Sequence, residues 1–268
     1  MKHFSYRLIA SLCFFTRLPF WRITNVPAEY YRQVVPLWPA AGWVTGGAMA
    51  VSYLLFRLIF PTSLCLLLAL CVRTLITGAL HEDGFADFCD GFGGGNNREH
   101  ILDIMKDSRV GTYGVIGLIL YYILFYNTLT DIADIVTHAD VTLPVIIFTA
   151  DVMSKAVSST LIYSLAYART EQSAKNRLVY SKSSLTDKLM TTCLSVIPCV
   201  ILYALCTTLP LMTLGVSVLV ACVARTILVH HMRRRIQGYT GDCCGATFII
   251  CELSMHATTL ACVYLACH

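Results

Sequence analysis

The chain has 268 residues, of which 56% are hydrophobic and only 13% are charged. A mean hydropathy of +0.65 excludes an ordinary soluble domain and is typical of a polytopic membrane protein. The formal net charge is only +4, so we expect no nucleic-acid partner, and the placement of the charges matters more than their sum.

The N-terminal segment, residues 1–33, is predicted to lie on the membrane rather than to cross it. Arg7 and Arg17 bracket a short apolar run with no small-residue cleavage site, which argues against a signal peptide. This pattern predicts an amphipathic helix in the interface, with both arginines near lipid head groups.

Seven apolar segments follow, each long enough to cross a hydrocarbon layer of about 30 Å. They cover residues 34–60, 62–80, 110–130, 141–168, 189–208, 210–230 and 246–267. The sequence therefore predicts an all-α fold, in which residues 1–268 form one membrane domain. That domain is a transmembrane helical bundle of about seven spans plus the N-terminal interfacial helix.

The basic residues are concentrated in alternate connections of this bundle. Sixteen of the twenty Lys and Arg residues lie in residues 1–33, 81–109, 169–188 and 231–245. The intervening connections, near 61, 131–140 and 209, contain none. The positive-inside rule places the basic connections in the cytoplasm, and we expect 81–109 and 231–245 to be active-site loops there.

The thirteen cysteines are predicted to be reduced and buried. Most of them lie inside the apolar segments and none forms a paired C-x-x-C spacing. Cys243 and Cys244 fall on the predicted cytoplasmic side, where a structural disulfide is not expected.

An acidic, glycine-rich stretch from His81 to Gly95 is the most informative motif. Asp83, Asp87 and Asp90 stand at i, i+4 and i+7, so they share one face of a helix. Such like charges repel one another, whereas Mg²⁺ takes oxygen ligands and bridges to substrate phosphates. We predict a Mg²⁺ site at Glu82, Asp83, Asp87 and Asp90; a solvated acidic loop is the plain alternative.

Two further polar sites lie at the same predicted membrane depth. Asp107 follows the first motif with Lys106 and Arg109 beside it, and this mixture of charges suits a polyphosphate. Asp242 precedes the last apolar segment. We expect all three sites to converge on one cavity, with Lys106, Arg109 and Asp242 binding substrate.

Several ionisable residues lie within the predicted spans, where each costs at least ~2.5 kcal/mol unless it has a partner. Asp151 and Lys155, at i and i+4, either neutralise each other or line the floor of the cavity. Glu252 and His256 have the same spacing, which favours a structural hydrogen bond. Arg73 and Arg225 need a carboxylate on another helix, or a substrate phosphate.

The chain resembles the cobalamin synthase family, the adenosylcobinamide-GDP ribazoletransferases. The resemblance lies in Phe14–Pro19, in Asp83–Gly91 after His81, in Met105–Gly114 and in Thr240–Ala246, and runs over nearly the whole length. The chain departs from the family pattern at Lys155, where an arginine is expected, and at Cys243-Cys244.

The resemblance implies an integral enzyme of the bacterial inner membrane that uses Mg²⁺ to join GDP-activated cobinamide to α-ribazole or its 5′-phosphate. The implied partners are these small-molecule substrates and the lipid bilayer, and the chain can form a homo-oligomer. We expect the 5′-hydroxyl of α-ribazole, or its 5′-phosphate ester, to attack the phosphorus attached to cobinamide, so that GMP leaves. Asp90 or Asp107 would be the catalytic base, and Lys106 and Arg109 the phosphate clamp.

Two other classes of protein share some of these features. A CDP-alcohol phosphotransferase has an acidic membrane metal site, but its motif expects Ala-Arg where this chain has Ala86-Asp87. A cation transporter usually places its ion site near the bilayer midplane and often has an internal repeat, whereas these carboxylates flank the spans.

Overall fold

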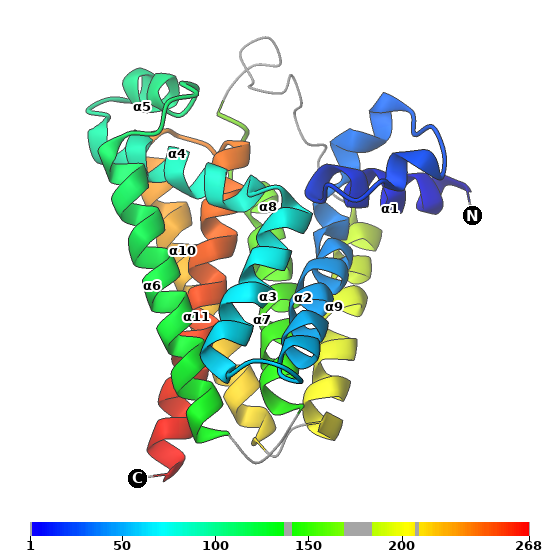
Figure 1. The fold of residues 1–268 in the computed structure, drawn as a ribbon. Coiled ribbons are helices and arrows are strands. Elements are labelled where there is room, and N and C mark those ends of the chain that lie inside the picture. The colour runs from blue at the N-terminus through cyan, green and yellow to red at the C-terminus, as the bar shows by residue number, and fades with distance from the viewer. Residues whose placement is uncertain (1, 137–140, 169–183, 207–208, 268) are drawn as a thin grey trace.

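The fold is a bundle of long helices, drawn in Figure 1 from a computed structural model that describes residues 2–136, 141–168, 184–206 and 209–267. The helices are α1 (Lys2–Phe15), α2 (Trp38–Phe56), α3 (Thr62–Thr77), α4 (Leu80–Gly94), α5 (Arg98–Ile104), α6 (Thr112–Ile135), α7 (Thr142–Ser159), α8 (Leu161–Ser164), α9 (Leu185–Cys206), α10 (Leu211–Arg235) and α11 (Gly241–Cys267). The described part of the chain contains no strand, only an isolated bridge between Tyr167 and Tyr239. The all-α prediction is confirmed.

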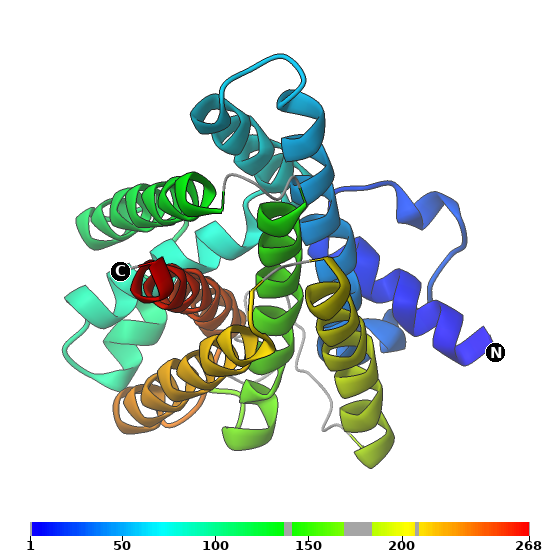
Figure 2. The ribbon, with the colours of Figure 1, turned by 90° about the horizontal axis from the view of Figure 1, so that it is seen from below.

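Each predicted span contains one long helix, although seven is an approximate count. Five helical segments are long and apolar enough to cross a membrane alone: α6, α7 with α8, α9, α10 and α11. The pair α3 and α4 makes a sixth if it counts as one bent span. α7 is the most deeply buried of these segments, and Figure 2 shows it in the middle of the bundle.

The basic segments meet at one end of the bundle, as the charge pattern predicts. Figure 1 shows α1, α4 and α5 at that end, together with the connection between α10 and α11. The guanidinium of Arg98 donates to the carbonyl oxygen of Ile236 at 3.0 Å, and that of Arg235 donates to Gly95 at 2.6 Å. Residues 169–183 of the basic segment 169–188 lie outside the described residues.

The helix predicted in the N-terminal segment is α1, which lies across the bundle rather than along it (Figure 1). The guanidinium of Arg7 forms an ion pair with Asp187 at 2.5 Å, and both side chains are largely buried. This contact fastens α1 to the first turn of α9.

Buried charges are paired inside the bundle. Asp151 and Lys155 on α7 form a fully buried ion pair, and the hydroxyl of Thr45 donates to Asp151 at 3.0 Å. Arg73 on α3 pairs with Glu252 on α11 at 2.5 Å, so its partner is the cross-helix carboxylate that we expected. Removing a charge from water is costly, and these pairs offset that cost.

The predicted hydrogen bond between Glu252 and His256 was wrong, and Arg225 has partners in the described residues that the sequence did not indicate. The Glu252 carboxylate binds Arg73, and neither ring nitrogen of His256 has a hydrogen-bond partner in the part of the chain described. Arg225 donates to the carbonyl oxygen of Thr160 at 2.7 Å and to the Ser164 hydroxyl, rather than to a carboxylate. The twelve cysteines that the structure describes are free, but the expectation that they are buried holds for only five of them, and four are exposed.

Glycines allow α2 to pack closely against the charged face of α7. A Cβ on Gly46 would lie 2.8 Å from the Cβ of Asp151, and a Cβ on Gly42 would lie 3.1 Å from its Oδ1. Small residues four apart are typical of membrane helices whose backbones come close together. Gly47 is different, because a Cβ there would meet only Phe148 atoms at 3.9 Å.

Replacement of Gly46 by Ala should therefore push α2 away from α7 and destabilise the bundle by about 1–3 kcal/mol, the usual cost of overpacking. Gly47→Ala is the matched control and should leave stability unchanged or slightly raised, because Ala favours a helix. Thermal unfolding of both variants in detergent measures the difference. Equal melting temperatures for the two variants would contradict this packing.

Candidate active site

A sharp bend after α3 places the acidic motif across one end of the bundle. Gly78, at φ +65°, ends α3 in the left-handed conformation that glycine adopts without penalty. Ala79 follows at φ 57°, which costs roughly 1–2 kcal/mol for a residue with a Cβ. α4 then runs at 87° to α3, so the acidic stretch is a helix as predicted, and the expected loop 81–109 is largely helical.

The backbones of α4 and α11 touch where these two helices cross. A Cβ on Gly84 would lie 3.0 Å from the Cα of Asp242, and a Cβ on Gly245 would lie 3.1 Å from the carbonyl oxygen of His81. Side chains at either glycine would force the helices apart. The contact brings Asp83 and Asp242, which are far apart in the sequence, to the same place.

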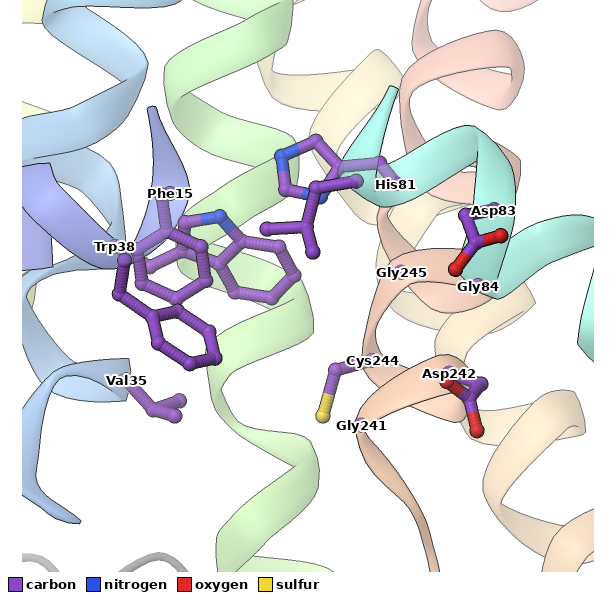
Figure 3. A pocket seen from close by; sticks show the side chains of 12 residues that line it. Phe15, Val35, Trp38, His81, Asp83, Gly84, Gly241, Asp242, Cys244 and Gly245 are labelled. Atoms are coloured by element: carbon purple, nitrogen blue, oxygen red, sulfur yellow. The ribbon is translucent and has the colours of Figure 1, made fainter. Parts of the chain in front are cut away.

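A cavity of about 260 Å³ lies at this crossing (Figure 3). It is lined by Phe14, Phe15, Val35, Trp38, Leu80, His81, Asp83, Gly84, Gly241, Asp242, Cys244 and Gly245. Figure 3 shows Asp83 and Asp242 on one side and the rings of Phe15 and Trp38 on the other. We call this space the aromatic cavity; it brings together two of the predicted site residues.

The other carboxylates of α4 lie outside this cavity's lining. Asp90 is buried, and its two oxygens accept the backbone N–H groups of Gly111 at 2.7 Å and Gly114 at 2.8 Å. Asp90 therefore caps the start of α6, and its roles in metal binding and proton transfer stay predictions. Asp87 is buried one turn before Asp90, and Glu82 is buried with one oxygen, Oε2, that has no hydrogen-bond partner among the described residues.

The second acidic motif does not reach the aromatic cavity. Arg109 and Asp107 bind each other, with 2.7 Å between Nη2 and Oδ2, and neither they nor Lys106 line the cavity. The guanidinium and backbone N–H of Arg109 lower the pKa of the Asp107 carboxyl to about 2. A carboxylate of such low basicity is a weak general base near neutral pH.

Of the four predicted Mg²⁺ ligands only Asp83 lines the cavity, together with Asp242 from α11, and the Mg²⁺ site stays a prediction. Within the described residues, no group of three or more His, Cys, Asp or Glu side chains is arranged to hold a metal ion. Mg²⁺ often keeps several waters and binds one or two carboxylates together with substrate phosphates. Asp83 and Asp242, from two helices that line one cavity, suit that arrangement.

Several residues of the site were given no role from sequence alone. Phe14 and Phe15 belong to a segment that we placed on the membrane surface, and Trp38 lies in the predicted span 34–60. Both Phe14–Pro19 and His81 stood inside motifs of the family resemblance, and this was the only signal that marked them. Their place in the site depends on how α1 packs on the bundle, which local sequence patterns do not specify.

Comparison with known proteins gives one consistent result. A family model described as cobalamin-5-phosphate synthase matches residues 7–260. An adenosylcobinamide-GDP ribazoletransferase from Vibrio cholerae is 32% identical over 255 residues, which cover 94% of this chain and 92% of that protein. A protein of the same name from Shewanella amazonensis is 31% identical over 252 residues, which cover 94% of this chain and 94% of that protein. No solved structure matches the chain.

The contacts of Asp90 predict a structural effect of its removal. Asp90→Ala should destabilise the protein by about 2 kcal/mol, because two backbone N–H groups at the start of α6 lose a charged acceptor. Asp103→Ala, at an exposed carboxylate on the neighbouring helix α5, is the control and should change stability little. Thermal unfolding in detergent compares them; an unchanged melting temperature for Asp90→Ala would contradict the capping role.

Proposed function

The chain belongs to the cobalamin-5-phosphate synthase family, and on that premise we propose that it joins GDP-activated adenosylcobinamide to α-ribazole or its 5′-phosphate, with release of GMP. One observation of the structure supports this most: Asp83 and Asp242 line a single cavity at the end of the bundle where the basic segments gather. Family membership leaves no support for a CDP-alcohol phosphotransferase or a cation transporter.

The reaction forms a phosphorus–oxygen bond to a ribose hydroxyl and breaks the bond to GMP. The family model is described as a cobalamin-5-phosphate synthase, a name that refers to a product carrying a 5-phosphate. A product that keeps that phosphate fits an acceptor phosphorylated at 5′ that attacks through another ribose hydroxyl, rather than the 5′-hydroxyl we expected. We propose that α-ribazole 5′-phosphate is the acceptor.

We assign the metal to Asp83 and Asp242, with Asp87 one turn away on α4. A bound Mg²⁺ would neutralise charge on the donor's diphosphate and on the leaving phosphate. The two side chains come from different helices, so the α4–α11 contact fixes the distance between them. Neither predicted base is well placed for the proton transfer: the pKa of Asp107 is low, and Asp90 uses both oxygens to accept backbone N–H groups outside the cavity's lining.

We propose that the protein lies in the bacterial inner membrane and that the cavity opens on its cytoplasmic side. The basic residues of 1–33 and 231–245 lie at the same end of the bundle, and the positive-inside rule places that end in the cytoplasm. A nucleotide-activated donor is available on that side. The exposed apolar side chains of α6, including Ile119, Leu120 and Ile123, suit contact with lipid.

Purified protein in lipid nanodiscs should release GMP when given GDP-cobinamide, α-ribazole 5′-phosphate and Mg²⁺, and should form a corrinoid of the expected mass. Chelation of divalent cations should stop GMP release, and added Mg²⁺ should restore it. Chromatography with mass spectrometry measures both products. Full turnover in the presence of chelator would exclude the metal from the proposal.

Asp83→Asn should lower kcat by about 100-fold, since the variant keeps the side chain's shape but loses the charge that holds the metal. Asp103→Asn removes an exposed carboxylate outside the cavity and should keep wild-type turnover. The same GMP assay compares the two. Wild-type rates in Asp83→Asn would remove this residue from the metal site.

A further inference from the structure

Asp83 lies between two cavities of different character. Beside the aromatic cavity is a second one of about 460 Å³, lined by Cys13, Phe14, Thr16, Arg17, Thr77, Gly78, Ala79, Leu80 and Asp83. We call it the Arg17 cavity. Both cavities share Phe14, Leu80 and Asp83, so a molecule bound in one has its end beside a molecule bound in the other.

The Arg17 cavity is lined by one cation, the exposed side chain of Arg17. The backbone N–H of Arg17 donates to the carbonyl oxygen of Ile76 at 2.6 Å, which ties the residue to the end of α3. Its side chain lies over Gly78, where any Cβ would collide with it. Among the described residues, no carboxylate forms an ion pair with Arg17. The guanidinium of an arginine presents a planar fork that matches phosphate oxygens.

The aromatic cavity has flat, apolar walls. The rings of Phe15 and Trp38 are stacked, with centroids 5.0 Å apart and an interplanar angle of 11°. His81 lies beside Trp38 at 5.4 Å. Nε1 of Trp38 and Nε2 of His81 are buried and have no hydrogen-bond partner in the described part of the chain. Such walls suit a planar ring that forms few hydrogen bonds.

The two substrates of the proposed reaction differ in the ring that they offer. An apolar cavity of about 150 Å³ holds a benzene ring, so 260 Å³ is enough for a fused bicycle and too small for a corrin. Guanine has more donors and acceptors along its edges than the two unpartnered nitrogens of Trp38 and His81 can pair, once Asp83 and Asp242 are assigned to the metal. A dimethylbenzimidazole joined to ribose has one free ring nitrogen, which makes it the better match.

We propose that the two cavities divide the substrates between them, an inference that rests on the proposed function. Arg17 binds the diphosphate of the donor in its own cavity. The stacked rings of Phe15 and Trp38 bind the base of the acceptor nucleoside in the aromatic cavity. Asp83, which both cavities share, lies where the acceptor's hydroxyl meets the phosphorus. Arg17 thus takes the clamp role that the sequence had suggested for Lys106 and Arg109.

The test measures the KM for each substrate in two variants with opposite expectations. Arg17→Gln should raise the KM for GDP-cobinamide by about 10–100-fold, through loss of a charged hydrogen bond, and leave the acceptor KM unchanged. Trp38→Leu should raise the KM for α-ribazole 5′-phosphate by about 10-fold and leave the donor KM unchanged. Arg17→Lys should restore only part of the donor affinity, because lysine lacks the fork.

Matched controls make the same chemical changes away from the cavities. Arg22→Gln alters an exposed arginine of the same segment, and Trp43→Leu alters a tryptophan on the outer side of α2 that lines neither cavity. Both should keep wild-type KM values. Thermal unfolding of each variant identifies one that fails to fold, and for Trp38 the milder Trp38→Phe then replaces Trp38→Leu, with a smaller rise in acceptor KM.

Equilibrium binding separates this inference from the proposed function. Calorimetry without turnover should show that Arg17→Gln weakens GDP, and that Trp38→Leu weakens free 5,6-dimethylbenzimidazole. A wild-type protein that forms no GMP would refute the reaction, while these two probes still decide the division of the cavities. If Trp38→Leu weakens GDP instead, guanine occupies the aromatic cavity and the inference is overturned. Equal effects of both variants on both probes would also overturn it.

Discussion

The contact between α4 and the start of α11 is possible only because Gly84 and Gly245 leave no side chain between the two backbones. Through this contact, Asp83 and Asp242 line one cavity although 159 positions separate them in the chain. The bend after α3 is the second requirement, since without it α4 would continue along the bundle instead of lying across its end. The candidate active site is therefore built mainly by backbone geometry.

The buried charges of the bundle hold the helix on which this geometry depends. Arg73 on α3 binds Glu252 on α11, lies 3.9 Å from Asp151 on α7 and donates to the hydroxyl of Tyr121 on α6 at 2.7 Å, so it joins four helices. α11 also carries Asp242 ten positions earlier, which is nearly three helical turns toward the cavity. Removal of Glu252 would leave the Arg73 charge without its closest partner in the core. It would also fix the position of α11, and so of Asp242, less firmly along the bundle.

Local patterns in the sequence predicted the helices well and their contacts less well. The span predicted at 62–80 corresponds to α3, Thr62–Thr77, and the acidic stretch is a helix because its spacing and its flanking glycines are local signals. The predicted partnership of Glu252 and His256 was wrong, because Glu252 binds Arg73 on another helix. Likewise, nothing in the local sequence shows that Trp38 lines a cavity, since its neighbours there come from α1, α4 and α11.

The pairing of Arg73 with Glu252 also has a bearing on how the protein is made. The ribosome synthesises Arg73 179 residues before its partner, so α3 leaves the ribosome with a charge that nothing in its own helix neutralises. Asp151 and Lys155, in contrast, enter the membrane together on α7 and cancel each other at once. An arginine is costly in hydrocarbon until it is paired. The close pair with Glu252 therefore forms only after α11 is made, whereas Asp151 on α7, 3.9 Å from Arg73, is available earlier.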